Sequence, residues 1–150
     1  MQLNFKDYNF TIKKNNGNTL IFDIVRKKSV ILTPEEWVRQ HVVHYLINEL
    51  GYPLGLIAVE KSMLINSQLK RFDVVVHNKI GQPMILIECK SPSVKITSKT
   101  LDQASNYQQF LKCEYAMLTN GLTHYFLHYQ FEEKTSQQID YLPKYDNKNL

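Results

Sequence analysis

The sequence predicts one α/β domain, in which a mixed central β-sheet carries helices on both faces and follows a β-rich N-terminal segment. Two apolar stretches at 71–77 and 84–90 flank a Gly-Gln-Pro turn and have the composition of neighbouring strands. A capped helix is predicted at 33–50, and a second helix of about 14 residues follows the strand pair. Because this second helix separates the strand at 84–90 from another at 114–119, we expect a right-handed crossover between parallel strands.

Composition places the chain among ordinary globular proteins. Its 150 residues are 43% hydrophobic and 21% charged, which is enough to bury one core. No apolar run approaches the roughly 18 residues of a membrane span, and the first residues lack a signal-peptide pattern, so we expect a cytoplasmic protein. Cys89 and Cys113 are too few for a disulfide framework. The net charge of +4 and the pI near 9.0 are compatible with nucleic acid as a partner without establishing it.

The chain divides into a β-rich segment at 1–32, a core at 33–131 and a polar tail at 132–150. In the first segment we expect strands at 8–12, 20–25 and 30–32, with a hairpin turn at Asn-Asn-Gly-Asn. The helix that follows has a well-marked start, with Thr33 as the N-cap, Pro34 at the first position and Glu36 completing a capping box.

Ionisable side chains stand at chosen places on the central strand pair. Glu88 and Lys90 share one face of their strand, whereas Cys89 points to the other face and into the core. If the strands are antiparallel neighbours, Asp73 lies beside Glu88, and two desolvated carboxylates repel each other. Mg²⁺ would relieve that repulsion, and Lys90 could orient or deprotonate an attacking water.

One consequence and one alternative follow from this arrangement. Without metal, Asp73→Asn should leave the protein as stable as the wild type or more so, because the repulsion is removed. In the alternative, Glu88 and Lys90 mark a strand end that reaches solvent, and Asp73 pairs with Lys70 or Arg71. Glu60, inside the strand at 56–65, could face the site, but we expect it to lie on a solvated face.

The spacing of Asp73 from Glu-Cys-Lys resembles the motif of the PD-(D/E)XK nuclease superfamily. Four further pieces resemble, more closely, the N-terminal nuclease domain of type I restriction enzyme R subunits, over about residues 30–130. They are Thr-Pro-Glu-Glu-Trp-Val-Arg-Gln at 33–40, Leu-Gly-Tyr-Pro at 50–53, Gln103 with Tyr107, and Leu-Thr-Asn-Gly at 118–121. Arg-Phe occupies the place of the motif's proline, a position that varies among members.

The resemblance implies a restriction-endonuclease-like core that hydrolyses DNA phosphodiesters with Mg²⁺, for which Mn²⁺ can substitute. The site residues that it implies fall into three groups: Asp73, Glu88 and the backbone carbonyl of Cys89 as metal ligands; Lys90 and Gln103 as further catalytic groups; and Glu36 and Tyr107 as supporting groups. From their charge and position we expect Lys95 and Lys99, which directly follow the site, and Arg39, one turn after Glu36, to contact nucleic acid. Two of these assignments compete with structural roles, since Glu36 also suits a helix cap and Gln103 with Tyr107 also suits a packed helix face.

Three functions remain open at this stage. The first is a DNA endonuclease whose partners are DNA and separately encoded motor or specificity subunits. The second is a nucleic-acid-binding or protein-interaction module that keeps the fold without catalysis. RNA as the substrate is the third. The sequence contains no Walker A motif, so we expect no DNA translocation by this chain itself.

Overall fold

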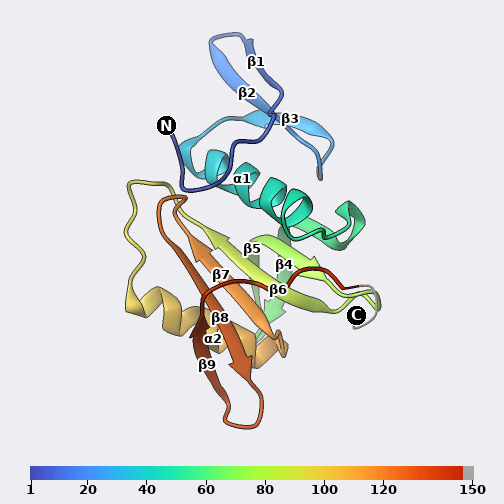
Figure 1. Cartoon of the computed structure of the whole chain (residues 1–150), viewed down its shortest axis with the longest axis vertical. Coiled ribbons are helices and arrows are strands. Elements are labelled where there is room, and N and C mark those ends of the chain that lie inside the picture. The colour runs from blue at the N-terminus through green and yellow to red at the C-terminus, as the bar shows by residue number, and fades with distance from the viewer. Residues whose placement is uncertain (147–150) are drawn as a thin grey trace.

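The computed structural model describes residues 1–146 and contains two β-sheets and two long helices (Figure 1). A three-stranded antiparallel sheet is formed by β1 (Ile12–Asn15), β2 (Asn18–Asp23) and β3 (Lys28–Ile31). The central sheet has six strands in sequence order: β4 (Ile57–Ile65), β5 (Gln68–His77), β6 (Pro83–Cys89), β7 (Tyr115–Thr119), β8 (His124–Gln130) and β9 (Thr135–Ile139). The helices are α1 (Pro34–Asn48) and α2 (Ser98–Leu111), with a short 3-10 turn at Leu54–Leu56.

The central sheet is mixed, as predicted. β6 and β7 are parallel and joined through α2, and every other neighbouring pair is antiparallel. The two helices cover opposite faces of the sheet (Figure 1). Under α1, Val42 and Leu46 pack with Val74 and Ile87, whereas under α2, Ala104 packs with the other core. Within residues 1–146, no helix is long and apolar enough to cross a membrane.

The start of α1 confirms Thr33 as the N-cap but not the full capping box. The Thr33 hydroxyl accepts a hydrogen bond from the backbone N–H of Glu36 at 3.0 Å. The backbone N–H of Thr33 donates instead to the Ile31 carbonyl at 3.1 Å, and the Glu36 carboxylate turns towards Arg26 and Arg39. Pairing with two guanidinium groups is stronger than one bond to a backbone amide, so the carboxylate leaves the cap.

Two expectations at the chain ends were wrong in part. The hairpin turn is confirmed, but its first strand begins at Ile12, because the preceding residues pack aromatic side chains against α1 instead of joining a ladder. The Phe10 ring, for example, lies 4.8 Å from that of Trp37. The polar tail contains the edge strand β9, which pairs with β8, and beyond it Leu142 is only 2% exposed.

The β4–β5 strand pair is distorted at one point along its length, and the side chains on either side of that point pack into different cores. Val59 and Val74 contribute to the core under α1, whereas Met63 and Phe72 contribute to the core under α2. Between them lie Glu60 and Asp73, opposite one another in the register, and Glu60 has φ 56. Residues held in this left-handed region are strained and cluster at functional sites. The positive φ of Glu60 therefore lies beside Asp73 in the strand pair.

Candidate functional site

Asp73 is fixed by two elements at once. Its Oδ1 accepts a hydrogen bond from Nη2 of Arg39 on α1 at 2.8 Å, and its Oδ2 accepts one from the backbone N–H of Cys89 on β6 at 2.8 Å. The side chain is 13% exposed. Neither oxygen can move without breaking a bond to a helix or a strand, so the carboxylate has a defined orientation.

Glu88 lies next to Asp73 on the neighbouring strand. The antiparallel register, in which Val74 faces Ile87, places the two carboxylates opposite each other. Burial, and then the charge of Asp73, raise the pKa of Glu88 to about 7, although the Lys70 ammonium opposes the rise. The structure thus brings together the two carboxylates that the sequence singled out, at the desolvation cost expected of them.

Glu88 keeps one oxygen without a hydrogen bond. Lys70 Nζ lies 3.3 Å from Glu88 Oε1, but the contact lacks hydrogen-bond geometry, and within residues 1–146 this buried oxygen has no donor. Its surroundings are apolar, since Phe72, Leu86 and Tyr107 line the same narrow space under α2. An unsatisfied buried carboxylate oxygen is costly, and such exceptions are typical of ligand sites.

Cys89 and Lys90 complete the motif at the end of β6. The Cys89 side chain is 1% exposed in the core under α1, as predicted, and burial raises the pKa of its thiol. Lys90 is half-buried, and its backbone N–H donates to the Thr119 carbonyl at 2.8 Å. The Lys90 ammonium forms no ion pair or hydrogen bond with any described residue, so it is available to a ligand.

The α2 residues are placed less close to the carboxylates. Tyr107 is half-buried, and its ring lies 5.4 Å from the ring of Phe72. Lys70 Nζ lies 5.7 Å from the centre of the Tyr107 ring, so Tyr107 packs beside the Lys70–Glu88 pair. Gln103 is exposed one turn earlier and forms no hydrogen bond to a described residue. Lys95 and Lys99 are exposed, in the loop before α2 and in its first turn.

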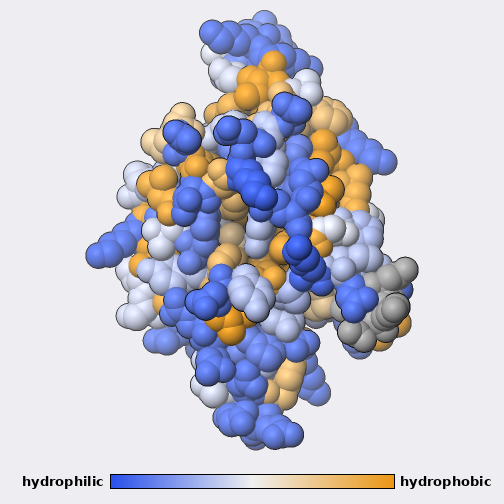
Figure 2. Space-filling view, in the orientation of Figure 1, coloured by the Kyte–Doolittle hydropathy of each residue, from blue (hydrophilic) through white to orange (hydrophobic). Residues whose placement is uncertain are grey.

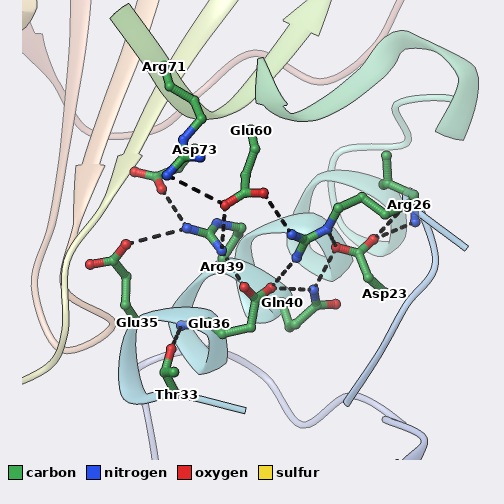
Figure 3. A network of polar contacts seen from close by, with 11 residues as sticks. Asp23, Arg26, Thr33, Glu35, Glu36, Arg39, Gln40, Glu60, Arg71 and Asp73 are labelled. Carbon is green, nitrogen blue, oxygen red and sulfur yellow. Dashed lines mark hydrogen bonds and ion pairs between the residues drawn. The ribbon is translucent and has the colours of Figure 1, made fainter. Parts of the chain in front are cut away.

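Arg39 does not lie at the surface, where we expected it to contact nucleic acid. It is 6% exposed and pairs with Asp73 and with Glu36, while Glu35 Oε1 lies 3.4 Å and Glu60 Oε1 4.0 Å away (Figure 3). Burial lowers the pKa of Arg39, but the hydrogen bond to Asp73 and the charges of Glu36 and Asp73 outweigh it and raise the pKa. The surrounding carboxylates therefore draw this side chain inward.

A second arginine, half-buried, extends the network to the N-terminal sheet. Arg26 pairs with Asp23 at 2.6 Å, with Glu36 at 2.6 Å and with Glu60 at 3.1 Å (Figure 3). Gln40 donates to Asp23 and to Glu36, both at 2.9 Å. We had expected Glu60 to lie on a solvated face. Its side chain instead turns towards this network.

Sequence reasoning missed Arg26, Lys70 and the partnership of Arg39 with Asp73. The Glu36–Arg39 pair follows from its spacing on one helix, since side chains three residues apart are neighbours. The Arg39–Asp73 pair joins residues 34 apart, and only the packing of α1 on the sheet creates it. Lys70 had been considered as a partner of Asp73, whereas the structure pairs it with Glu88.

The donor groups at this site fit a hard divalent cation. Within residues 1–146, no group of three or more His, Cys, Asp or Glu residues is arranged to hold a metal. Mg²⁺ is typically bound by one or two carboxylates and completes its shell with waters and phosphate oxygens. Asp73 and Glu88 supply two such groups, although a cation at Oε1 of Glu88 would have to displace the Lys70 ammonium, which lies 3.3 Å away.

Comparisons with known proteins identify the family and the fold of the chain. Residues 34–143 match the family described as Type I restriction enzyme R protein N terminus. The fold is similar to the structure of a fragment described as an HsdR subunit of a type I restriction enzyme from Vibrio vulnificus, with a TM-score of 0.51 and 20% identity. That match covers 75% of this chain and 24% of the other, so this chain spans about a quarter of that protein. No curated protein is significantly similar to the chain. The structural likeness confirms the predicted α/β fold.

Proposed function

Because the chain belongs to the family of type I restriction enzyme R protein N termini, we propose that it is a metal-dependent nuclease domain that hydrolyses DNA phosphodiesters. The observation that carries the proposal is the pair formed by Asp73 and Glu88, in which burial and like charge raise the pKa of Glu88. Lys90 follows two residues later. Carboxylates and an ammonium group in this arrangement suit phosphodiester hydrolysis.

Each side chain has a defined task in this proposal. Asp73, oriented by hydrogen bonds from Arg39 and from the Cys89 amide, presents a fixed carboxylate to the site. Glu88 supplies the second carboxylate and loses its proton when a cation binds. Bound Mg²⁺ would supply Lewis-acid polarisation of the phosphate and of a water molecule. The Lys90 ammonium aligns the attacking water or stabilises the negative charge that develops on the phosphate oxygens.

A second function is favoured by a different observation. Each carboxylate already has a cation from the chain itself, since Arg39 lies on Asp73 and Lys70 lies beside Glu88. Internal cations of this kind lower the demand for a metal ion and suit a module that binds nucleic acid or another subunit without catalysis. Under this function, DNA is bound but left intact.

Cleavage of supercoiled plasmid separates the two functions. With Mg²⁺ or Mn²⁺, the nuclease converts supercoiled plasmid into nicked and linear forms, whereas EDTA, Glu88→Gln and Lys90→Met abolish this conversion. Lys13→Ala with Lys14→Ala changes exposed residues of β1, distant in sequence from the site, and serves as the control. Plasmid left intact with both metals would support the binding module, and cleavage of RNA but not DNA would redirect the proposal to RNA.

The partners and compartment follow from the proposal. We propose DNA and other restriction subunits as partners, because this chain spans only about a quarter of its HsdR relative. Motor and specificity functions would be supplied by these other subunits. A restriction nuclease acts on DNA in the cytoplasm, which is the location we propose.

A further inference from the structure

The β4–β5 pair extends beyond the central sheet as a two-stranded ribbon. β5 pairs with β6 only from Val74 onward, so residues 61–65 and 68–72, which we call the distal ribbon, have only each other as ladder partners within residues 1–146. Asn66 and Ser67 connect the strands with φ values of 51 and 64. Two residues with positive φ form the tight hairpin turn that best matches the twist of paired strands.

The two faces of the distal ribbon differ in what they contact. Met63, Ile65 and Phe72 pack into the core under α2. On the outer face, Leu64 lies directly opposite Leu69, and the two are 63% and 74% exposed. A cross-strand pair of leucines left in water contributes little to the core, and exposed apolar groups that lie together are typical of binding surfaces.

The charge of the distal ribbon is of one sign. Residues 61–72 contain Lys61, Lys70 and Arg71 and no acidic residue. Lys70 reaches the site, 3.3 Å from Glu88, and Arg71 is 67% exposed and lies 4.0 Å from Glu60 (Figure 3). The cationic surface is therefore continuous with the two carboxylates, which suits a polyanion lying across the site.

The width of the distal ribbon fits the groove of one kind of nucleic-acid duplex better than that of another. Paired strands lie about 5 Å apart, and a two-stranded ribbon enters the major groove of B-form DNA, about 12 Å wide, but not the narrow minor groove. The major groove of A-form RNA is too deep and narrow for such contacts. From Asp73 to the turn at Asn66 the strand extends for about 20 Å, or about six base pairs of B-form DNA.

We propose that the outer face of the distal ribbon lies in the major groove of duplex DNA next to the site. Arg71, which shares the outer face with Leu64 and Leu69, contacts a phosphate, and Leu64 with Leu69 meets the base edges, where thymine methyl groups are the apolar partners. This inference rests on the proposed function and deepens it, because it assigns duplex DNA rather than duplex RNA as the ligand. Figure 2 shows the wider setting, in which hydrophilic side chains cover much of one face of the molecule and apolar side chains are interspersed among them.

The test measures binding without cleavage. Glu88→Gln protein in EDTA is titrated with a fluorescent 20-base-pair duplex, and Arg71→Ala and Leu64→Ser with Leu69→Ser are added on this background. Arg71→Ala should lower the slope of log affinity against log salt by about 0.9, the contribution of one phosphate. Lys13→Ala with Lys14→Ala, which also removes exposed cations, should leave the slope unchanged.

A second measurement compares binding to duplexes that differ only in their thymine methyl groups. Replacing thymine with uracil removes only the methyl groups, and should weaken binding about fourfold for each methyl contacted. The Leu64→Ser, Leu69→Ser protein should bind both duplexes equally, and a duplex RNA of the same sequence should bind more weakly than DNA to the parent. Thermal melts verify that the exposed substitutions leave the fold intact.

The outcomes separate this inference from the proposed function. Equal affinity of the parent and the Leu64→Ser, Leu69→Ser protein for thymine DNA would overturn the inference and leave the outer face to a protein partner. Equal affinity for duplex RNA and DNA would also overturn it. Ribbon-dependent binding by a protein that never nicks plasmid would refute only the nuclease function, whereas nicking with ribbon-independent binding would refute only the inference.

Discussion

Replacing Glu88 with glutamine should stabilise the metal-free protein at pH 8. The pKa of Glu88 is raised from 4.5 to about 7 by burial and by the charge of Asp73, and its side chain is only 17% exposed. Each pKa unit corresponds to about 1.36 kcal/mol, so the ionised carboxylate destabilises the fold by up to about 3 kcal/mol. The amide removes this cost, and because the pKa of about 7 already includes the opposing effect of Lys70, the gain is up to about 3 kcal/mol.

The same shift gives the sign of the pH dependence. Because the folded state binds the Glu88 proton more tightly than the unfolded chain does, its contribution to stability is fully present below pH 4.5. That contribution is lost as the pH rises to about 7 and beyond. The free energy of unfolding of the wild type should therefore fall across this window relative to that of Glu88→Gln. Well below pH 4.5 the carboxyl is neutral in both states, and at pH 4.5 only the unfolded chain is about half ionised, so there the two proteins should differ little.

Urea unfolding at pH 4.5 and pH 8, in EDTA and in excess Mg²⁺, measures these differences. At pH 8, Mg²⁺ at ten times its Kd should stabilise the wild type by about 1.4 kcal/mol and should leave Glu88→Gln unchanged. If Glu88→Gln unfolds at lower urea than the wild type at pH 8 in EDTA, Glu88 holds the fold together through Lys70. The reasoning from repulsion would then be refuted.

Two further substitutions test the packing around the site. Arg39→Met should lower the free energy of unfolding by about 3 to 5 kcal/mol in urea titrations, because it leaves buried carboxylates unpaired, whereas Arg71→Met, at an exposed position, should change it by less than about 0.5 kcal/mol. A small effect of Arg39→Met would show that the buried pair is dispensable. Gly121→Ala should lower the free energy of unfolding by about 1 to 3 kcal/mol, because Gly121 has φ +84 and an added Cβ would lie 2.8 Å from a Leu3 methyl. Gly17→Ala is the control, since Gly17 has φ +80 but open space around it and therefore carries the conformational cost alone. Equal losses of stability in thermal melts of the two variants would refute the packing argument.

Local signals predicted much of the fold. The N-cap at Thr33, the hairpin turn in the first segment and the crossover through α2 each depend on a few neighbouring residues, and all three are confirmed. The strand β9 was missed because its Thr-Ser-Gln-Gln-Ile sequence carries little apolar character. It forms through ladder bonds to β8 at the edge of the sheet, where polar side chains remain in water.

The candidate site could be predicted only where its residues lie on adjoining strands. Asp73 and Glu88 meet because the hairpin that joins β5 and β6 fixes their register. The cation on Asp73 comes from α1, and no spacing in the sequence reveals it. This changes one expectation, because Asp73→Asn removes repulsion with Glu88 but also deprives Arg39 of a buried partner. We now expect a loss of stability from Asp73→Asn, and Glu88→Gln becomes the cleaner test of repulsion.

Titration with Mn²⁺ at pH 8 tests the central claim most directly, namely that Asp73 and Glu88 form one cation site. Isothermal titration of the wild type should show a single weak site, since such ions keep most of their waters. Asp73→Ala and Glu88→Ala should each abolish the heat, and lowering the pH to 5.5 should weaken wild-type binding because Glu88 is then protonated. A normal binding curve in the protein that carries both substitutions would contradict the account.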